Sequence, residues 1–153
     1  SAKPLDAFEQ ISKEVGYVLE NNEVTASIRD CIINGDPVTK MRRIADAVGA
    51  NLLFDDEKVV LMPKKGSRKT QGELPLINSS NGMIGYPTFS NNGINVSCFF
   101  RPELRIGANF KLESIVPHAS GTWKIVALKH ELSANDPAGG SWKTSISGIY
   151  PRW

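Results

Sequence analysis

The sequence predicts an α+β fold, with a small α+β domain at residues 1–68 followed by an all-β, antiparallel domain, a barrel or a sandwich, at residues 69–153. Two observations lead to this prediction. Apolar residues recur with the helical period of about 3.6 in the first part and mostly alternate with polar residues in the second. A short basic run at residues 64–69 separates the two patterns and is expected to be a solvated linker.

Two amphipathic helices are expected in the first domain, and a glycine follows each of them. The first helix begins near Pro4, and its apolar stripe is formed by Leu5, Phe8, Ile11 and Val15. Asp36 and Pro37 are typical of the N-cap and the first residue of a helix, so a second helix is expected over residues 38–48.

Strands follow both helices in the same order, which indicates a repeated helix-strand-strand unit. Short apolar strands are expected at residues 17–19 and 52–54. After turns rich in Asn or Asp, return strands are expected at residues 24–33 and 59–62. Each such unit must bury one helical face against a small sheet, so this half is predicted to be a compact α+β domain.

The second domain is expected to contain about six short strands separated by turns. They are placed at residues 74–77, 83–86, 94–100, 109–115, 123–132 and 142–150. Pro75 favours an edge position for the first strand, because proline cannot donate to a ladder. The second and third strands form a β-hairpin around a polar turn, and the chain leaves that hairpin through a corner at Pro102.

The aromatic residues of the second domain are expected to lie mostly in its core. The alternation at residues 123–132 places Trp123, Ile125 and Ala127 on one face of a strand and Val126 and Leu128 on the other, so both faces are expected to be covered. Large aromatic residues in alternating strands usually pack in the interior, although a tryptophan can also stack on a sugar or a base. Trp142 is expected in the core, whereas Trp153 is expected to be exposed or to fit a partner.

The composition excludes several classes of function. The 18 basic and 16 acidic residues give a net charge of +2, too balanced for a nucleic-acid groove or a membrane-binding face. No stretch approaches the ~20 apolar residues of a membrane span. We therefore expect no nucleic-acid partner and no membrane span. Cys31 and Cys98 lack metal-ligand spacing, so we expect buried free thiols in a reducing compartment.

No set of residues points to reaction chemistry, so we expect no catalytic residue, no cofactor site and no metal site, and the protein is not expected to be an enzyme. His118 lies in a loop and His130 in a strand, neither beside a convincing nucleophile. The acidic run at residues 55–57 lacks the spacing of a calcium loop and is interpreted as a turn.

The stretch at residues 82–107 resembles the hub proteins of bacteriophage tail baseplates, in particular the C-terminal portion of the hub of contractile tails. The resemblance is carried by Gly-Met-Ile-Gly-Tyr-Pro-Thr-Phe and by Gly-Ile-Asn-Val-Ser-Cys-Phe-Phe-Arg-Pro-Glu-Leu-Arg-Ile-Gly. Gly-Thr-Trp-Lys-Ile, His-Glu-Leu and Gly-Gly-Ser-Trp support it further along the chain. With these segments the likeness extends over nearly the whole sequence.

The resemblance implies a structural, non-enzymatic component of the virion. Such a hub is made in the bacterial cytoplasm, assembles as a homotrimer and joins the tail tube to the spike in the baseplate. Hubs of this family usually carry more chain before the matching region. The start of this sequence, which has no methionine and no signal-peptide core, is expected to be a cut within a longer protein.

The corner after the hairpin is the candidate interaction site. Arg101, Pro102, Glu103 and Arg105 surround it, and the two arginines and the glutamate are suited to ion pairs with a neighbouring subunit. Trp153 is also expected to contact a partner. The alternative for each charged residue is a solvated loop.

Two other functions remain open from the sequence. The helix-strand-strand repeat also resembles the small ring-building domains of secretion channels. A cell-wall or glycan hydrolase of a tail tip is the third candidate, but a glycosidase needs two carboxylates about 5 to 10 Å apart, and no convincing pair stands out.

Overall fold

The computed structural model describes residues 4–26, 33–133 and 140–151. The chain forms two compact units, Ser1–Gly66 (unit 1) and Ser67–Trp153 (unit 2). Each unit has its own cluster of buried apolar residues. The two units are described separately below, because each is built around its own sheet.

The two helices predicted for unit 1 are confirmed, as α1 (Pro4–Glu14) and α2 (Pro37–Ala47). Asp36 caps α2, because its carboxylate accepts a 3.1 Å hydrogen bond from the backbone N–H of Thr39 and a 2.6 Å bond from the Thr39 hydroxyl. These two bonds hold the pKa of Asp36 below its ordinary value.

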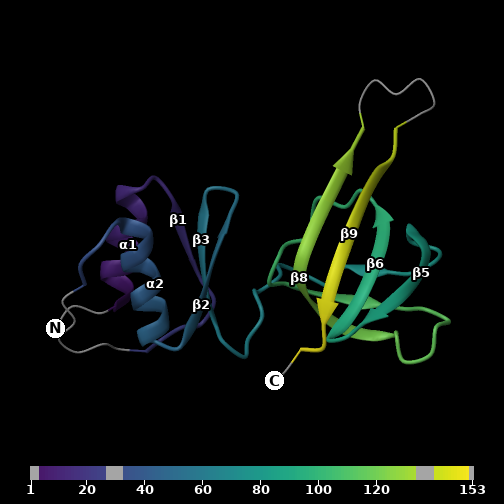
Figure 1. Cartoon of the computed structure of the whole chain (residues 1–153), viewed down its shortest axis with the longest axis horizontal. Coiled ribbons are helices and arrows are strands. Elements are labelled where there is room, and N and C mark those ends of the chain that lie inside the picture. The colour runs from purple at the N-terminus through teal and green to yellow at the C-terminus, as the bar shows by residue number, and fades with distance from the viewer. Residues whose placement is uncertain (1–3, 27–32, 134–139, 152–153) are drawn as a thin grey trace. The chain divides into compact units, whose positions relative to one another are not determined.

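Unit 1 contains a three-stranded sheet with the strand order β1-β3-β2. Its strands are β1 (Val18–Asn21), β2 (Ala50–Asp55) and β3 (Lys58–Pro63). β2 and β3 form the predicted antiparallel pair, whereas β1 runs parallel to β3. Both helices cover one face of this sheet (Figure 1), where the core gathers Phe8, Met41, Ile44, Ala50, Val59 and Leu61.

The return strand predicted to begin at Val24 is not present at residues 24–26, which have no regular structure. The side chain of Asn21 explains this, because its oxygen accepts from the Val24 N–H (3.0 Å) and its amide donates to the Val24 carbonyl (3.1 Å). These bonds satisfy the backbone groups that a strand ladder would use. The rest of the predicted strand falls largely outside the described residues, so the repeat is incomplete in the part that the structure describes.

Unit 2 is a curled, open half-barrel built from one six-stranded sheet with the strand order β4-β7-β8-β9-β6-β5 (Figure 1). The strands are β4 (Leu76–Ile77), β5 (Met83–Ser90), β6 (Gly93–Phe99), β7 (Asn109–Leu112), β8 (Gly121–Leu132) and β9 (Trp142–Ile149). All neighbours are antiparallel except β4 and β7, which are parallel. The two-residue β4 lies at an edge, as Pro75 predicts.

The core of unit 2 fills the inside of this half-barrel. It contains Ile94, Val96, Cys98, Phe110, Leu112, Trp123, Ile125 and Ile146. Trp123 is buried as predicted, and its indole N–H donates to the Ala119 carbonyl at 2.8 Å. Burial raises the pKa of the Cys98 thiol to about 11. Cys31 lies outside the described residues.

Two predictions about β8 and β9 are wrong: that Ala127 shares a face with Trp123 and Ile125, and that Trp142 lies in the core. Ala127 is exposed, because a register shift between Ile125 and Ala127 changes the face that the following residues occupy. Trp142 is 53% exposed, because it pairs with Leu132 at the last rung of β8–β9, beyond the core. Its indole N–H instead donates to the Ser133 carbonyl at 3.1 Å. No helix among the described residues is long and apolar enough to cross a membrane.

Candidate assembly surface

The β5–β6 hairpin forms one edge of the half-barrel. β5 pairs with β6 and with no other described strand, so one side of its backbone faces outward. The pairing is irregular between Ile84 and Thr88, where Gly85 adopts a positive φ of 69° and Pro87 is buried. A bulge and a proline in an edge strand interrupt a continuous ladder, which limits unspecific strand addition.

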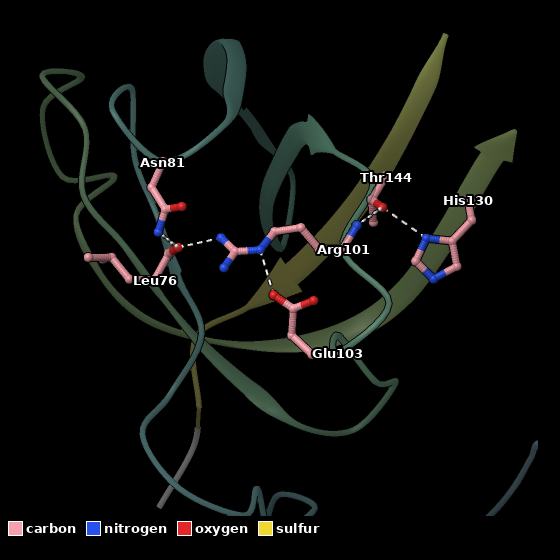
Figure 2. A network of polar contacts seen from close by, with 6 residues as sticks. All are labelled: Leu76, Asn81, Arg101, Glu103, His130 and Thr144. Carbon is pink, nitrogen blue, oxygen red and sulfur yellow. Dashed lines mark hydrogen bonds and ion pairs between the residues drawn. The ribbon is translucent and has the colours of Figure 1, made fainter. Parts of the chain in front are cut away.

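The chain leaves this hairpin through the predicted corner, and Arg101 fastens that corner to β4. The guanidinium Nη1 donates to the Leu76 carbonyl at 2.6 Å, and Nε donates to Oε1 of Glu103 at 2.6 Å (Figure 2). The Arg101 side chain is 20% exposed, so these charge-assisted bonds are partly shielded from water. Arg101 therefore acts within its own unit.

The same corner is also bonded to the neighbouring strand β9 through Thr144 (Figure 2). The backbone N–H of Arg101 donates to the Thr144 hydroxyl at 3.2 Å, and that hydroxyl lies 2.8 Å from Nδ1 of His130. Thr144 is fully buried. His130 thus belongs to a hydrogen-bonded network that links β8, β9 and the corner.

The structure brings only some of the predicted interaction residues together. Arg101 and Glu103 form an ion pair, whereas Pro102, Glu103 and Arg105 are exposed at the surface of the corner. The backbone carbonyl of Arg105 accepts from the Ala108 N–H at 3.2 Å, which closes a turn. Trp153 lies outside the described residues. Contact of this corner with a partner therefore remains a prediction.

The two arginines provide a matched pair for mutation. We expect Arg101→Ala to lower the free energy of unfolding of unit 2 by about 1 to 2 kcal/mol, because it removes two charge-assisted hydrogen bonds. Arg105→Ala, at an exposed position, is expected to change it by less than about 0.5 kcal/mol. Urea unfolding followed by tryptophan fluorescence measures both. Equal midpoints for the two variants would contradict a structural role for Arg101.

Sequence reasoning missed the apolar residues that the hairpin exposes. Ile84, Tyr86, Phe89 and Phe99 are all at least 40% exposed. The exposure of Phe99 could have been predicted from the sequence. Ile94, Val96 and Cys98 alternate along β6 and face inward, so Phe99 must point outward. The exposure of Ile84 and Tyr86 could not be predicted in this way, because the register of β5 is irregular between Ile84 and Thr88. An exposed apolar group of this kind is typical of an interaction surface.

Three charged residues form an ion cluster on the neighbouring strands β8 and β9. The Glu131 carboxylate lies 2.7 Å from the Lys129 ammonium and 2.8 Å from the Lys143 ammonium. Hydrogen bonds from these two lysines lower the pKa of Glu131 to about 2. No group of three or more His, Cys, Asp or Glu side chains that could hold a metal ion occurs among the described residues.

The ion cluster predicts how the stability of unit 2 depends on pH. Folding lowers the pKa of Glu131 from 4.5 to about 2, so its contribution is complete above about pH 4.5 and is lost as the pH falls towards 2. Glu131→Gln is expected to remove this contribution and to flatten the acid side of the profile. Urea midpoints of both proteins between about pH 2 and 7 test this, and parallel profiles would contradict it. About 1 M NaCl should reduce the difference between the urea midpoints of the wild type and Glu131→Gln, because the ion cluster is exposed and salt screens it.

The family described as baseplate hub gp41 matches residues 6–138, which include parts of both units. No curated protein sequence gives a significant match.

Two solved structures share the fold. One is the 43 kDa tail protein of prophage MuSo2 from Shewanella oneidensis, with a TM-score of 0.65, 12% identity, and coverage of 98% of this chain and 64% of that chain. The other is a tail protein from Neisseria meningitidis MC58, with a TM-score of 0.65, 9% identity, and coverage of 97% and 67%. This chain therefore spans about two thirds of the length of these proteins.

Proposed function

This chain belongs to the baseplate hub gp41 family, and from that premise we propose that it is a non-catalytic hub subunit that joins the tail tube to the spike of a bacteriophage. The observation that carries the proposal is the family match over residues 6–138. A match of this extent includes most of α1, all of α2 and the first five strands of unit 2, together with the hairpin exit. The protein is accordingly a virion component of the tail.

We propose that the subunits assemble as a closed homotrimeric ring. The six-stranded sheet of unit 2 is open, with the short β4 at one edge and the eight-residue β5 at the other. The Leu76 carbonyl of β4 already accepts from Arg101 and Asn81, so β5 is the edge that a neighbour would cover, and a head-to-tail contact whose rotation closes generates a ring. The exposed apolar residues of β5 and β6 support the same proposal, because such residues are costly to leave in water.

We also propose that the two units are separate domains, with a boundary near residue 68. Each has its own apolar core, and the basic run at residues 64–69 joins them. A hub with two domains can present different surfaces to the tube and to the spike.

Binding to the natural neighbours tests the proposed function. The protein, carried in its full-length gene product, is mixed with the tube and spike proteins of the same phage and isolated by an affinity tag. Retention of both partners is expected, with the tube protein of an unrelated phage as the control. If neither partner is retained, the hub function is refuted. Clearing of a cell-wall suspension by the isolated protein would instead favour the hydrolase.

A further inference from the structure

The outer face of the unit 2 sheet has a shallow hollow of about 410 Å³. The register places small side chains on this face in cross-strand rows, with Asn95 opposite Ser147 and Ser97 opposite Ser145. The shifted register of β8 adds Ala127 beside Ser147 and Lys129 beside Ser145. Small side chains at the centre of a sheet face leave room for another surface to approach closely.

Two kinds of side chain border this hollow. Ile84 lies opposite Ser97, and Phe99, which is 64% exposed, lies two residues further along β6. Phe99 pairs with Lys143, which in turn pairs with Glu131. The hollow is thus flanked by apolar residues on the β5–β6 side and by the ion cluster on the β8–β9 side, where two lysines surround one glutamate. From here on, the term unit 2 hollow includes the cavity, the apolar residues Ile84 and Phe99, and the ion cluster of Lys129, Glu131 and Lys143.

Unit 1 exposes a group of apolar and acidic side chains at the end of its sheet. Tyr17 and Phe54 form a T-shaped pair with ring centroids 5.8 Å apart, and Val18 beside them is 65% exposed. The backbone N–H of Val18 donates to the Glu57 carbonyl at 3.0 Å, which fixes this apolar group at the β2–β3 turn. Asp56 and Glu57 in that turn are exposed and acidic. We call these five residues the unit 1 tip.

The two surfaces are complementary in charge. The unit 1 tip is a turn that combines apolar and acidic side chains, beside Lys58, which is paired with Glu20 at 3.9 Å. The unit 2 hollow combines apolar side chains with two lysines and one glutamate. The same difference holds for the whole units: unit 1 has 9 basic and 11 acidic residues, and unit 2 has 9 basic and 5 acidic residues. Opposite potentials of this kind steer association and fix its register.

We propose that the unit 1 tip of one subunit docks into the unit 2 hollow of a second copy of this chain. This inference rests on the proposed function and specifies which surfaces meet in the ring. Because the two surfaces differ, the contact is head-to-tail, which is the kind of contact that generates closed rings. Tyr17, Val18 and Phe54 would cover the small side chains, and Asp56 and Glu57 would face Lys129 and Lys143.

Charge reversal on either surface tests the contact. The triple variant Lys129→Glu, Glu131→Lys, Lys143→Glu keeps both local ion pairs and reverses the sign of the cluster. On the other surface, Asp56→Asn combined with Glu57→Lys reverses the charge of the tip, and asparagine tolerates the positive φ of 47° at residue 56. Lys111→Glu, on β7, changes the net charge by as much as the triple variant and serves as its control.

Self-association of the full-length protein is measured by light scattering, and the fold of every variant is checked by its thermal midpoint. The triple variant is expected to associate about tenfold more weakly than the Lys111→Glu control, and the tip variant about tenfold more weakly than the wild type. A 1:1 mixture of the two reversed variants is expected to recover a mixed complex, captured through a tag on one of them, because each then offers the charge that the other needs.

The outcomes separate this inference from the proposed function. If the wild type and both reversed variants assemble equally well and still bind the tube and spike proteins, the docking contact is refuted while the hub function stands. If each variant loses assembly but their mixture recovers none, the contact between copies is likewise refuted, since a contact within one chain behaves in that way. A wild type that stays monomeric and binds neither partner refutes both.

Discussion

Replacing Gly93 by alanine is expected to lower the free energy of unfolding of unit 2 by about 3 kcal/mol or more. A Cβ on Gly93 would lie 2.0 Å from the backbone carbonyl oxygen of Gly148. A backbone carbonyl inside a strand cannot turn away as a flexible side chain can, so β6 and β9 would have to separate where Ile94 pairs with Gly148. The loss arises from this close approach and not from a loss of backbone freedom.

Gly85 is the matched control for this variant. It has a positive φ of 69°, but a Cβ there would meet nothing within 4 Å. Gly85→Ala is therefore expected to cost only the strain of a left-handed residue, about 1 to 2 kcal/mol. Both variants are unfolded in urea with tryptophan fluorescence as the signal. If Gly85→Ala lowers the free energy of unfolding at least as much as Gly93→Ala does, the close contact between β6 and β9 is not the cause of the loss in Gly93→Ala.

Truncating one core phenylalanine in each unit is expected to unfold one unit and spare the other. Phe8 and Phe110 are both fully buried, each in the core of its own unit. Replacing a buried phenylalanine by alanine typically costs about 3 to 5 kcal/mol, which is a large share of the stability of a small domain. If the units are separate domains, Phe8→Ala acts on unit 1 and Phe110→Ala acts on unit 2.

The chain offers separate signals for the two unfolding transitions. All three tryptophans, Trp123, Trp142 and Trp153, lie in unit 2, so tryptophan fluorescence follows that unit. Both helices of the described residues lie in unit 1, so the helical circular dichroism signal follows the unfolding of unit 1. Phe8→Ala should lower the dichroism midpoint and leave the fluorescence midpoint unchanged, and Phe110→Ala should do the reverse. Coincident shifts in both signals would show a single cooperative domain.

Much of the fold was predictable because local chemistry and tertiary structure agree. The Asp36-Pro37 helix start, the apolar stripes of both helices and the hairpin turn all depend on neighbours in the sequence. The wrong predictions arise where a single side chain or a single extra residue decides whether a strand forms or which face its residues occupy. Asn21 replaces a strand ladder at Val24 with its own hydrogen bonds, and a register shift in β8 turns Ala127 outward.

The candidate surface was predictable only in part, because its members are distant in the sequence. The corner at Pro102 was found from the pattern, but the bond from Arg101 to the Leu76 carbonyl depends on how β4 is placed. The ion cluster of Lys129, Glu131 and Lys143 forms only when β8 and β9 pair. Outward-facing Phe99 follows from strand alternation, whereas its proximity to Lys143 follows from the register between strands.

The molar mass of the full-length protein in solution, measured by light scattering over a range of concentrations, tests the proposed ring most directly. A head-to-tail hub predicts a mass of about three chains that persists on dilution into the low micromolar range, together with a decrease in assembly as salt is raised. A mass of one chain at every concentration, unchanged by addition of the tube and spike proteins, would contradict the account.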